Sequence, residues 1–264
     1  MSMYVQHQTG KLLLPPSHPL RIVSLVPSIS ELLFDLGLND EVVGITKFCV
    51  HPKEWFKSRT RIGGTKTVSF EKIKALEPTL IFANKEENVK EQVDKLANHF
   101  LVYVSDIVTL DDAFEMIKDT GILTGTEAKA NELVQQIDAS FQLLNFEQQV
   151  RTLYLIWQKP YMSIGGDTFI NSMLQKSGFK NALANARRYP EVTIEEIKVL
   201  KPDVLLLSSE PFPFKQKHIN ELKELTGIEK IILVDGEIFS WYGSRMLNAG
   251  AYFAKLRESL FLTS

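Results

Sequence analysis

Two segments of 15 residues share one sequence pattern, and this repeat restricts the possible folds more than any other feature. Residues 69–83 read SFEKIKALEPTLIFA, and residues 193–207 read TIEEIKVLKPDVLLL. Each copy begins with a Ser or Thr of helix-capping type, has Glu in the first turn, and passes through Pro into an apolar run typical of a buried strand. The offset is 124 residues (195 minus 71). Two such copies predict two similar α/β units.

Short apolar runs recur along both halves of the chain, with helical spacing between them. This alternation predicts right-handed crossovers and mainly parallel sheets. One helix is expected over residues 30–36, where Ser28 and Glu31 have the spacing of a capping box. The predicted strands are residues 21–26, 42–46, 80–84 and 101–105 in the first half, and residues 153–158, 204–208 and 231–235 in the second.

Residues 126–149, between the two sets, show no strand pattern. Leu133, Ile137, Phe141 and Leu144 instead recur at spacings of four, four and three, which indicates one helical stripe. A helix of about 22 residues would be about 33 Å long, so we expect it to connect the units. The alternative is an ordinary crossover helix in a single sheet, but the repeat favours two units. The expected organisation is an N-terminal α/β lobe (20–122), a connecting helix (123–149) and a C-terminal α/β lobe (150–264).

Composition and charge exclude several classes of protein. With 44% hydrophobic and 23% charged residues, the chain is expected to fold in water. A net charge of −2 gives no field that would gather nucleic acid, so no nucleic-acid partner is expected. Cys49 is the only cysteine, and the five histidines show no close pairing, so we expect neither a disulfide nor a bare-metal site.

The sequence contains none of the common cofactor-binding or catalytic motifs. The turn after the first predicted strand reads VPSISE where a dinucleotide-binding protein would have G-x-G-x-x-G, and no Walker, G-x-S-x-G or H-E-x-x-H sequence is present. The pair Gly165 and Gly166 is too little to suggest a dinucleotide site. We therefore predict a protein that is not an enzyme and has no intrinsic cofactor.

The first 20 residues lack the basic start and the continuous apolar stretch of a signal peptide. No run of the chain reaches the roughly 18 to 20 apolar residues needed to cross a bilayer. Two interpretations stay open: a leader is missing from this sequence, or the protein works inside the cell.

Glu71 and Glu195 occupy equivalent positions of the repeat, each in the first turn of its predicted helix. A carboxylate there is stabilised by the helix dipole by roughly 0.3 to 1 kcal/mol, so capping alone would explain both. The alternative is that the two form a pair of acidic contacts for arginines on a two-fold symmetric partner.

Three segments, taken in order and at their spacing, resemble one family. They are RIVSLVPSISELLFDLG (21–37), RIGGTKTVSFEKIKALEPTLIFA (61–83) and YPEVTIEEIKVLKPDVLLL (189–207). The chain is similar to the periplasmic substrate-binding proteins with a rigid helical backbone, of the cobalamin and ferric-siderophore type. Segments such as KFCVHP (47–52) and FSWYGSR (239–245) place it closer to a branch without signal peptides.

The resemblance implies a fold, a partner and a class of ligand. The fold is two Rossmann-like lobes joined by one long helix, with the ligand in a cleft between the lobes. The implied function is to deliver cobalamin, haem or a ferric siderophore, as a monomer, to the permease dimer of an ABC importer, with Glu71 and Glu195 docking on permease arginines. The implied compartment is the periplasm. A carrier or sensor for a corrinoid or metal chelate inside the cell, without a permease, is the alternative.

Candidate ligand-binding residues follow from the rule that open α/β units bind ligands beyond the carboxyl ends of their strands. Aromatic and cationic side chains in these loops would suit a planar macrocycle or an aromatic chelate. By resemblance, Phe48 and Tyr189 match aromatic pocket positions of the cobalamin binder. The full set is Phe48, His51, Lys66, Trp157, Tyr161, Tyr189, Phe212, Trp241, Tyr242 and Arg245.

Several of these side chains have a second interpretation. Trp157 could belong to the core at a strand end, and Phe212 could pack its loop against its own lobe. Lys66 and Arg245 could neutralise an anionic chelate or be solvated. His51 could be an axial ligand to a metal in a macrocycle, but beside a proline it is more often structural. The loop aromatics, among them Trp241, are expected to lack a core to fill.

Overall fold

The computed structural model describes residues 5–6, 8–16 and 19–261. These residues form two compact α/β units, as predicted from the repeat. The first unit contains the chain up to Ile107 together with Asp111–Gln136 and Tyr242–Arg245, and the second contains Val108–Leu110, Ile137–Trp241 and the chain from Met246 onward.

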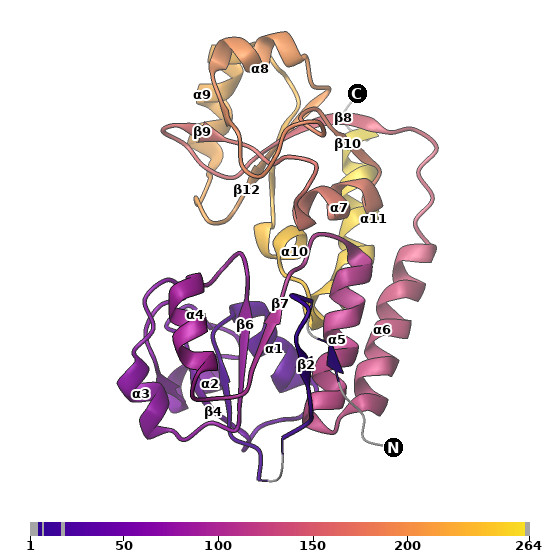
Figure 1. The fold of residues 1–264 in the computed structure, drawn as a ribbon. Helices are drawn as coiled ribbons and strands as arrows, with labels where there is room; N and C mark the ends of the chain where they lie inside the picture. Colours follow the sequence, from indigo (N-terminus) through magenta and orange to yellow (C-terminus); the bar gives the residue numbers. More distant parts are fainter. Residues whose placement is uncertain (1–4, 7, 17–18, 262–264) are drawn as a thin grey trace. The chain divides into compact units, whose positions relative to one another are not determined.

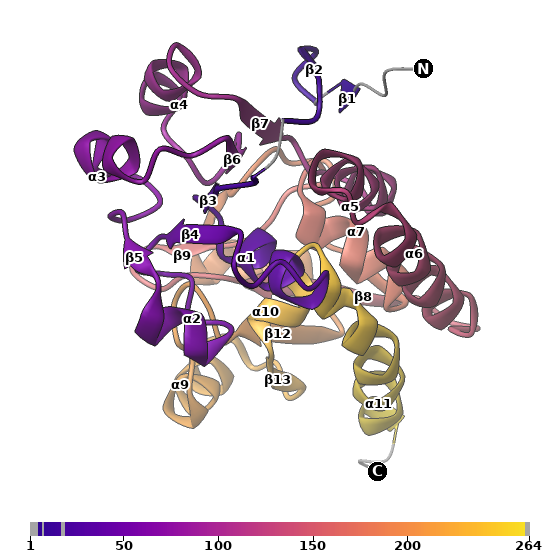
Figure 2. The ribbon, with the colours of Figure 1, turned by 90° about the horizontal axis from the view of Figure 1, so that it is seen from below.

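The first unit is built on a parallel sheet with the strand order β5-β4-β3-β6-β7 (Figure 1). Helices α3 and α4 cover one face of this sheet, and α1 lies on the other face (Figure 2). The adjacent residues Ile81 and Phe82 of β6, whose side chains point to opposite faces of the sheet, are fully buried, which places the core between these layers. The elements are β3 (Ile22–Ser24), α1 (Pro27–Asp35), β4 (Val42–Ile45), α2 (Lys53–Ser58), β5 (Thr60–Arg61), α3 (Phe70–Ala75), β6 (Leu80–Asn84), α4 (Lys90–Ala97) and β7 (Val102–Ser105).

Helix α1 begins earlier than predicted, and the capping box at Ser28 is wrong. Pro27 occupies the start of the helix, and the N-cap residue Val26 makes no side-chain capping bond. Proline suits this position because its fixed φ is helical and its missing N–H would have no partner there. Glu31 instead forms an ion pair with Arg245.

Two helices follow the first sheet, α5 (Leu110–Thr124) and α6 (Glu127–Gln142). They pack closely at Gly121, because a Cβ on this glycine would lie 2.6 Å from the Cβ of Ala130. Of the predicted stripe, Leu133, Ile137 and Phe141 are buried, as expected for one helical face, whereas Leu144 is half-buried and lies beyond the end of α6. The helix has 16 residues and not about 22.

The early end of α6 has a long-range cause. Leu143, just past the helix, is 84% exposed, whereas Phe146 packs against Gly178 and lies under the Arg257 guanidinium, 5.1 Å from the ring centroid. The chain must leave the helix to place Phe146 there.

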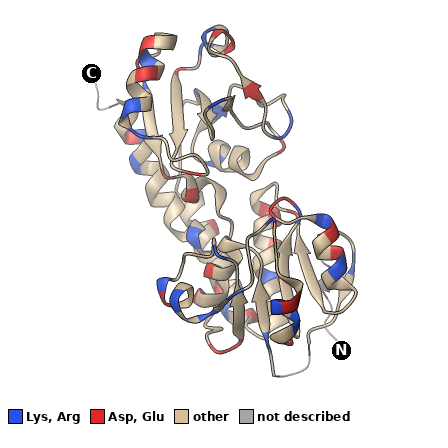
Figure 3. Cartoon of the chain, turned by 90° about the vertical axis from the view of Figure 1, so that its left-hand side faces the viewer, with Lys and Arg blue, Asp and Glu red and all other residues tan. Residues whose placement is uncertain are grey.

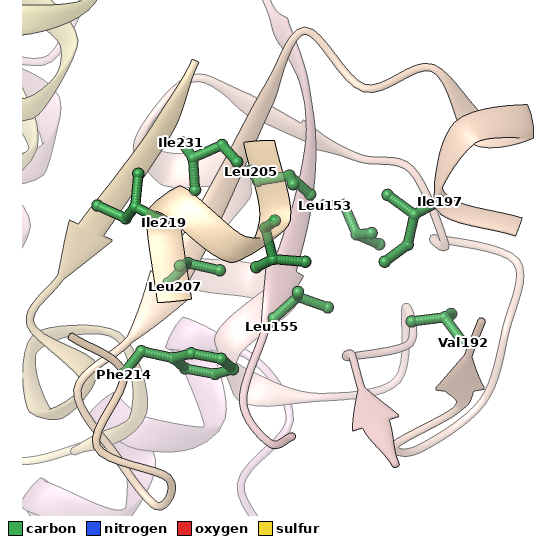
Figure 4. Packing of buried hydrophobic residues seen from close by; sticks show 10 residues of the cluster. Leu153, Leu155, Val192, Ile197, Leu205, Leu207, Phe214, Ile219 and Ile231 are labelled. Atoms are coloured by element: carbon green, nitrogen blue, oxygen red, sulfur yellow. The ribbon is translucent and has the colours of Figure 1, made fainter. Parts of the chain in front are cut away.

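The second unit has a four-stranded parallel sheet with the order β10-β8-β12-β13, and a two-stranded antiparallel sheet of β11 and β9. Figure 4 shows its core, in which Leu153 and Leu155 of β8 meet Leu205 and Leu207 of β12. The elements are β8 (Val150–Leu155), β9 (Tyr161–Met162), α7 (Phe169–Lys176), β10 (Phe179–Asn181), β11 (Glu191–Val192), α8 (Ile194–Leu200), β12 (Val204–Ser208), α9 (Gln216–Thr226), β13 (Ile231–Val234), α10 (Gly236–Ser240), the 3-10 helix η1 (Ser244–Asn248) and α11 (Ala249–Phe261).

A small hairpin of β1 (Val5–Gln6) and β2 (Leu12–Leu13) precedes the first sheet. In both units, basic and acidic residues are interspersed along the helices (Figure 3). No helix in the described part of the chain combines the length and the apolar character needed to cross a membrane.

A buried carboxyl group, Asp119 of α5, makes the stability of the first unit depend on pH. The Tyr103 hydroxyl donates to Asp119 Oδ2 at 2.9 Å, and burial raises the pKa of Asp119 from 3.8 to about 6. Because the folded state binds this proton more tightly than the unfolded state, stability is lost as pH rises from about 4 through about 6. Asp119→Asn should therefore be more stable than the wild type by about 2 kcal/mol at pH 7, with a smaller difference at pH 4.

Urea denaturation of both proteins at pH 4 and pH 7 measures this difference. Asp111→Asn, at an exposed position in the first turn of the same helix, is the control: it should lose the helix-dipole contribution of roughly 0.3 to 1 kcal/mol and should not gain stability at pH 7. Parallel pH profiles for the wild type and Asp119→Asn would show that the buried carboxyl does not set the pH dependence.

Candidate functional site

The first unit presents Phe48 beyond the carboxyl end of β4. The Phe48 side chain is 51% exposed, and the Lys47 ammonium lies 5.0 Å from its ring centroid. A Cβ on Gly64 would approach the Phe48 ring to 3.3 Å, so glycine lets the ring lie close to the backbone of the neighbouring loop. An exposed aromatic ring at this edge is available for a ligand.

Lys66 and His51 lie in the same set of loops. Lys66 is exposed, and its Nζ donates to the backbone oxygen of Glu86 at 2.6 Å. The loops are joined by Asn88, whose Nδ2 donates to the oxygen of Thr65 at 3.0 Å. His51 is half-buried, and its role as an axial ligand stays a prediction.

Tyr242 and Arg245 belong to the first unit, and both differ from expectation. Tyr242 is buried, with its hydroxyl 3.5 Å from Glu87 Oε1, and burial raises its pKa well above the ordinary value. Arg245 Nε and Nη2 donate to the two carboxylate oxygens of Glu31 at 2.8 and 2.6 Å. Arg245 is therefore ion-paired with Glu31 and not freely solvated, and its contact with an anionic chelate stays a prediction.

The second unit carries an aromatic group at the carboxyl edge of β8, which we call the aromatic platform (Trp157, Phe212, Phe214 and His218). Trp157 is 39% exposed, and its ring meets Phe212 edge to face at 5.7 Å. Phe212 in turn contacts Phe214 and His218, with centroids at 4.8 and 5.3 Å. Phe212 therefore packs within its own unit, the second of its two interpretations, while part of Trp157 faces solvent.

Backbone contacts hold the platform at the strand ends. The Phe212 N–H donates to the oxygen of Ile156 at 3.2 Å, which ties the loop after β12 to the end of β8. His218 Nδ1 accepts the Lys215 N–H at 2.8 Å, and burial lowers the pKa of His218. A neutral, fixed imidazole supports the two phenylalanine rings.

Trp241 corrects the expectation that the loop aromatics lack a core. It is 9% exposed, and its Nε1 donates to Glu210 Oε1 at 3.1 Å. The same oxygen accepts the Ser240 hydroxyl at 2.6 Å, and burial raises the pKa of Glu210. Glu210 was missed from the sequence, where its only signal is an acidic residue two positions after the predicted strand 204–208.

Tyr161 is the first residue of β9 and Tyr189 lies two residues before β11, and both side chains are half-buried. The Gln158 amide donates to the Tyr161 hydroxyl at 3.2 Å, and the Arg188 guanidinium lies 5.6 Å from the Tyr189 ring centroid. These contacts leave ring surface exposed, and ligand contact by either tyrosine stays a prediction.

The repeat forms the same local structure in both units. Ser69 caps α3 by accepting the Lys72 N–H, and Thr193 caps α8 in a capping box with Glu196. Both helices end before the proline, as predicted, and the preceding residues Glu77 and Lys201 have φ of 45° and 44°. The near-identical backbone conformation at these two positions supports an internal duplication.

Glu71 and Glu195 are exposed in the first turns of these helices. Neither caps its own helix in the way that Glu196 does. Both carboxylates are therefore accessible to a partner, and docking on a permease stays a prediction.

Among the described residues, no group of three or more His, Cys, Asp or Glu side chains is placed to hold a metal ion. Two of the five histidines, His7 and His18, lie outside the described residues. Cys49 is buried with its Sγ 3.0 Å from the Ser30 hydroxyl, and burial raises the pKa of its thiol.

Comparison with known proteins gives a consistent set of relatives. Residues 22–234 match the family described as periplasmic binding protein. The uncharacterized ABC transporter substrate-binding lipoprotein YvrC of Bacillus subtilis is 26% identical over 260 residues, which cover 92% of this chain and 80% of YvrC. A protein of Vibrio parahaemolyticus named vitamin B12-binding protein is 26% identical, covering 71% of this chain and 70% of that protein.

A solved structure shows the same fold. The periplasmic haem-binding protein RhuT of Roseiflexus sp. RS-1, in its apo form, superposes with a TM-score of 0.77. The match covers 92% of this chain and 98% of that chain at 22% sequence identity.

Proposed function

Because the chain belongs to the periplasmic binding protein family, whose members bind and do not catalyse, we propose that it is the substrate-binding protein of an ABC importer and carries a metal chelate with a broad planar face. Cobalamin and haem have such a face, and a ferric siderophore, whose iron is octahedral, is the third candidate among metal chelates. The B. subtilis relative is named an ABC transporter substrate-binding lipoprotein, which supports this role and a site of action outside the cytoplasmic membrane.

The observation that carries the choice of ligand is the aromatic platform. Trp157 is partly exposed at the carboxyl edge of β8 and packs edge to face on the Phe212 ring. A rigid indole gives a flat contact at low entropic cost, which matches the face of a macrocycle or an aromatic chelate. The names of the V. parahaemolyticus and Roseiflexus relatives point to a corrinoid and to haem.

The proposed partner is a permease dimer with arginines on its docking face. Glu71 and Glu195 are one exposed carboxylate on each unit, in equivalent turns. Carboxylates pair with arginine in a bidentate geometry, which fixes orientation as well as adding affinity. Two equivalent carboxylates suit a partner whose halves are related by a two-fold axis.

Titration calorimetry of the protein with cyanocobalamin, haemin and a ferric hydroxamate tests the ligand proposal. We expect saturable binding of at least one chelate, and Trp157→Ala should weaken it about tenfold through loss of ring contact. Trp157→Phe retains a planar ring and should recover most of the affinity. No binding of any of the three chelates would exclude the proposed class, and unchanged affinity in Trp157→Ala would remove the platform from the site.

A further inference from the structure

Two arginines, one in each unit, hold the end of the helix that carries the docking glutamate. Arg21 Nε and Nη2 donate to the backbone oxygen of Leu76 at 2.9 and 2.7 Å, directly after α3. Arg151 Nε donates to the oxygen of Leu200, the last residue of α8, at 3.1 Å. Leu200 lies 124 residues after Leu76, the offset of the repeat.

The backbones of the same arginines are fixed by a second pair of equivalent residues. The Arg21 N–H donates to Thr79 Oγ1 at 2.9 Å, and the Thr79 N–H donates back to the Arg21 oxygen at 2.8 Å. The Arg151 N–H donates to Asp203 Oδ2 at 2.9 Å, and the Asp203 N–H donates back to the Arg151 oxygen at 2.8 Å. We call each set of contacts an arginine clamp.

Both helices need such support. Helix α3 has six residues and α8 has seven, lengths at which a helix is marginal without tertiary contacts. Each has one buried side chain, Ile73 and Ile197, again 124 residues apart. Figure 4 shows Ile197 beside Leu153 and Leu205 of the second core.

Apolar packing fixes the position of each helix: besides Ile197, the half-buried Ile194 and Leu200 of α8 pack against the second core, and Phe70 of α3 packs on Phe100. The clamp supplies a second attachment, at a carbonyl that has no partner inside the helix. A guanidinium at the carboxyl end also matches the negative end of the helix dipole. Because apolar packing and the arginine contact together fix the axis of the helix, they also fix the direction in which the first-turn glutamate points.

We propose that Arg21 and Arg151 are positioning residues that set the orientation of Glu71 and Glu195 for docking on the permease. The inference rests on the proposed function, because it assigns these arginines a role in presenting the docking surface. Neither arginine touches the partner or the ligand in this scheme. Their effect passes through α3 and α8.

The test is docking affinity in a double variant, Arg21→Met with Arg151→Met, which keeps the apolar stems and removes the donors. The probe is an ABC permease dimer of the vitamin B12 type in nanodiscs, with cyanocobalamin as ligand. We expect docking to weaken about tenfold while the Kd for cyanocobalamin stays within about twofold. Hydrogen exchange should accelerate in residues 70–76 and 194–200 and stay unchanged in β6 and β12. The double Lys variant, with one donor group per side chain, should recover part of the docking affinity.

Arg59→Met is the matched control, since Arg59 Nη2 donates to the backbone oxygen of Asn39 at 2.6 Å away from both docking helices. It should leave docking unchanged, and equal weakening in this control would reduce the arginine effect to general destabilisation and overturn the inference. The double variant Glu71→Ala with Glu195→Ala distinguishes failure of the positioning role of the arginines from failure of the docking role of the glutamates. If this variant weakens docking and the arginine variant does not, the clamps have no positioning role. If the glutamate variant and the arginine variant both dock as tightly as the wild type, the proposed docking surface itself is wrong.

Discussion

Replacing Glu71 and Glu195 together with alanine is expected to lower permease-dependent uptake at least about a hundredfold, while ligand affinity stays within about twofold. Truncating one partner of a hydrogen-bonded charge pair at an interface costs about 2 to 5 kcal/mol, and two such pairs would be lost. Both carboxylates are exposed on short helices and neither belongs to the proposed ligand-binding residues, so ligand affinity should be unchanged. ATP-dependent uptake of labelled cyanocobalamin into proteoliposomes, beside calorimetry of the free protein, measures the two effects separately.

Glu54→Ala with Glu224→Ala is the control for loss of two negative charges. Glu54 lies in the first turn of α2 and Glu224 lies on α9, so each unit again loses one exposed glutamate from a helix. Uptake by this variant should match the wild type. Full uptake by the Glu71 and Glu195 variant would show that their position in the repeat serves only helix stability.

Strands with an apolar pattern could be predicted from the sequence, and strands without one could not. The runs at 80–84 and 204–208 have the bounds of β6 and β12, because every side chain in them is buried. Strand β5 was missed, since Thr60 and Arg61 are exposed and the strand exists only through backbone pairing with β4. Backbone pairing leaves no trace in the order of side chains.

Helix ends depend on residues distant in sequence. Glu31 was expected to cap its own helix, yet its partner is Arg245, 214 residues later. The end of α6 depends on Phe146 packing against Gly178. In both cases a local pattern was present, and a nonlocal contact decided the outcome.

The candidate site shows the same division. Position after a strand was enough to find the part-exposed Trp157 and Phe48. Position alone could not predict the hydrogen bond from Trp241 to Glu210, because these residues are 31 positions apart and come together only when the chain folds. The arginine clamps were also missed, although a signal exists: an arginine stands at the start of the first apolar run in each half, at residues 21 and 151.

Gly165→Ala is expected to destabilise the protein by about 3 kcal/mol, the second large effect. A Cβ at this buried position would lie 2.5 Å from the oxygen and 2.8 Å from the carbonyl carbon of Ala186. The Gly165 N–H also donates to the oxygen of Arg188 at 2.7 Å, so the two backbone segments cannot separate without losing this bond. Close backbone packing thus accounts for a glycine pair that has no nucleotide-binding context. Urea denaturation measures the loss in free energy of unfolding.

Gly227→Ala separates crowding from backbone strain in the same unit. Gly227 caps α9 with φ of 72°, and a Cβ at this position would meet no atom within 4 Å, so alanine there should cost only about 1 kcal/mol. The expected difference of about 2 kcal/mol between the variants is then the cost of forcing apart residues 163–168 and 184–188. Equal destabilisation by the two substitutions would mean that these segments move apart freely, and the Gly165 contact would have no part in the stability of the second unit.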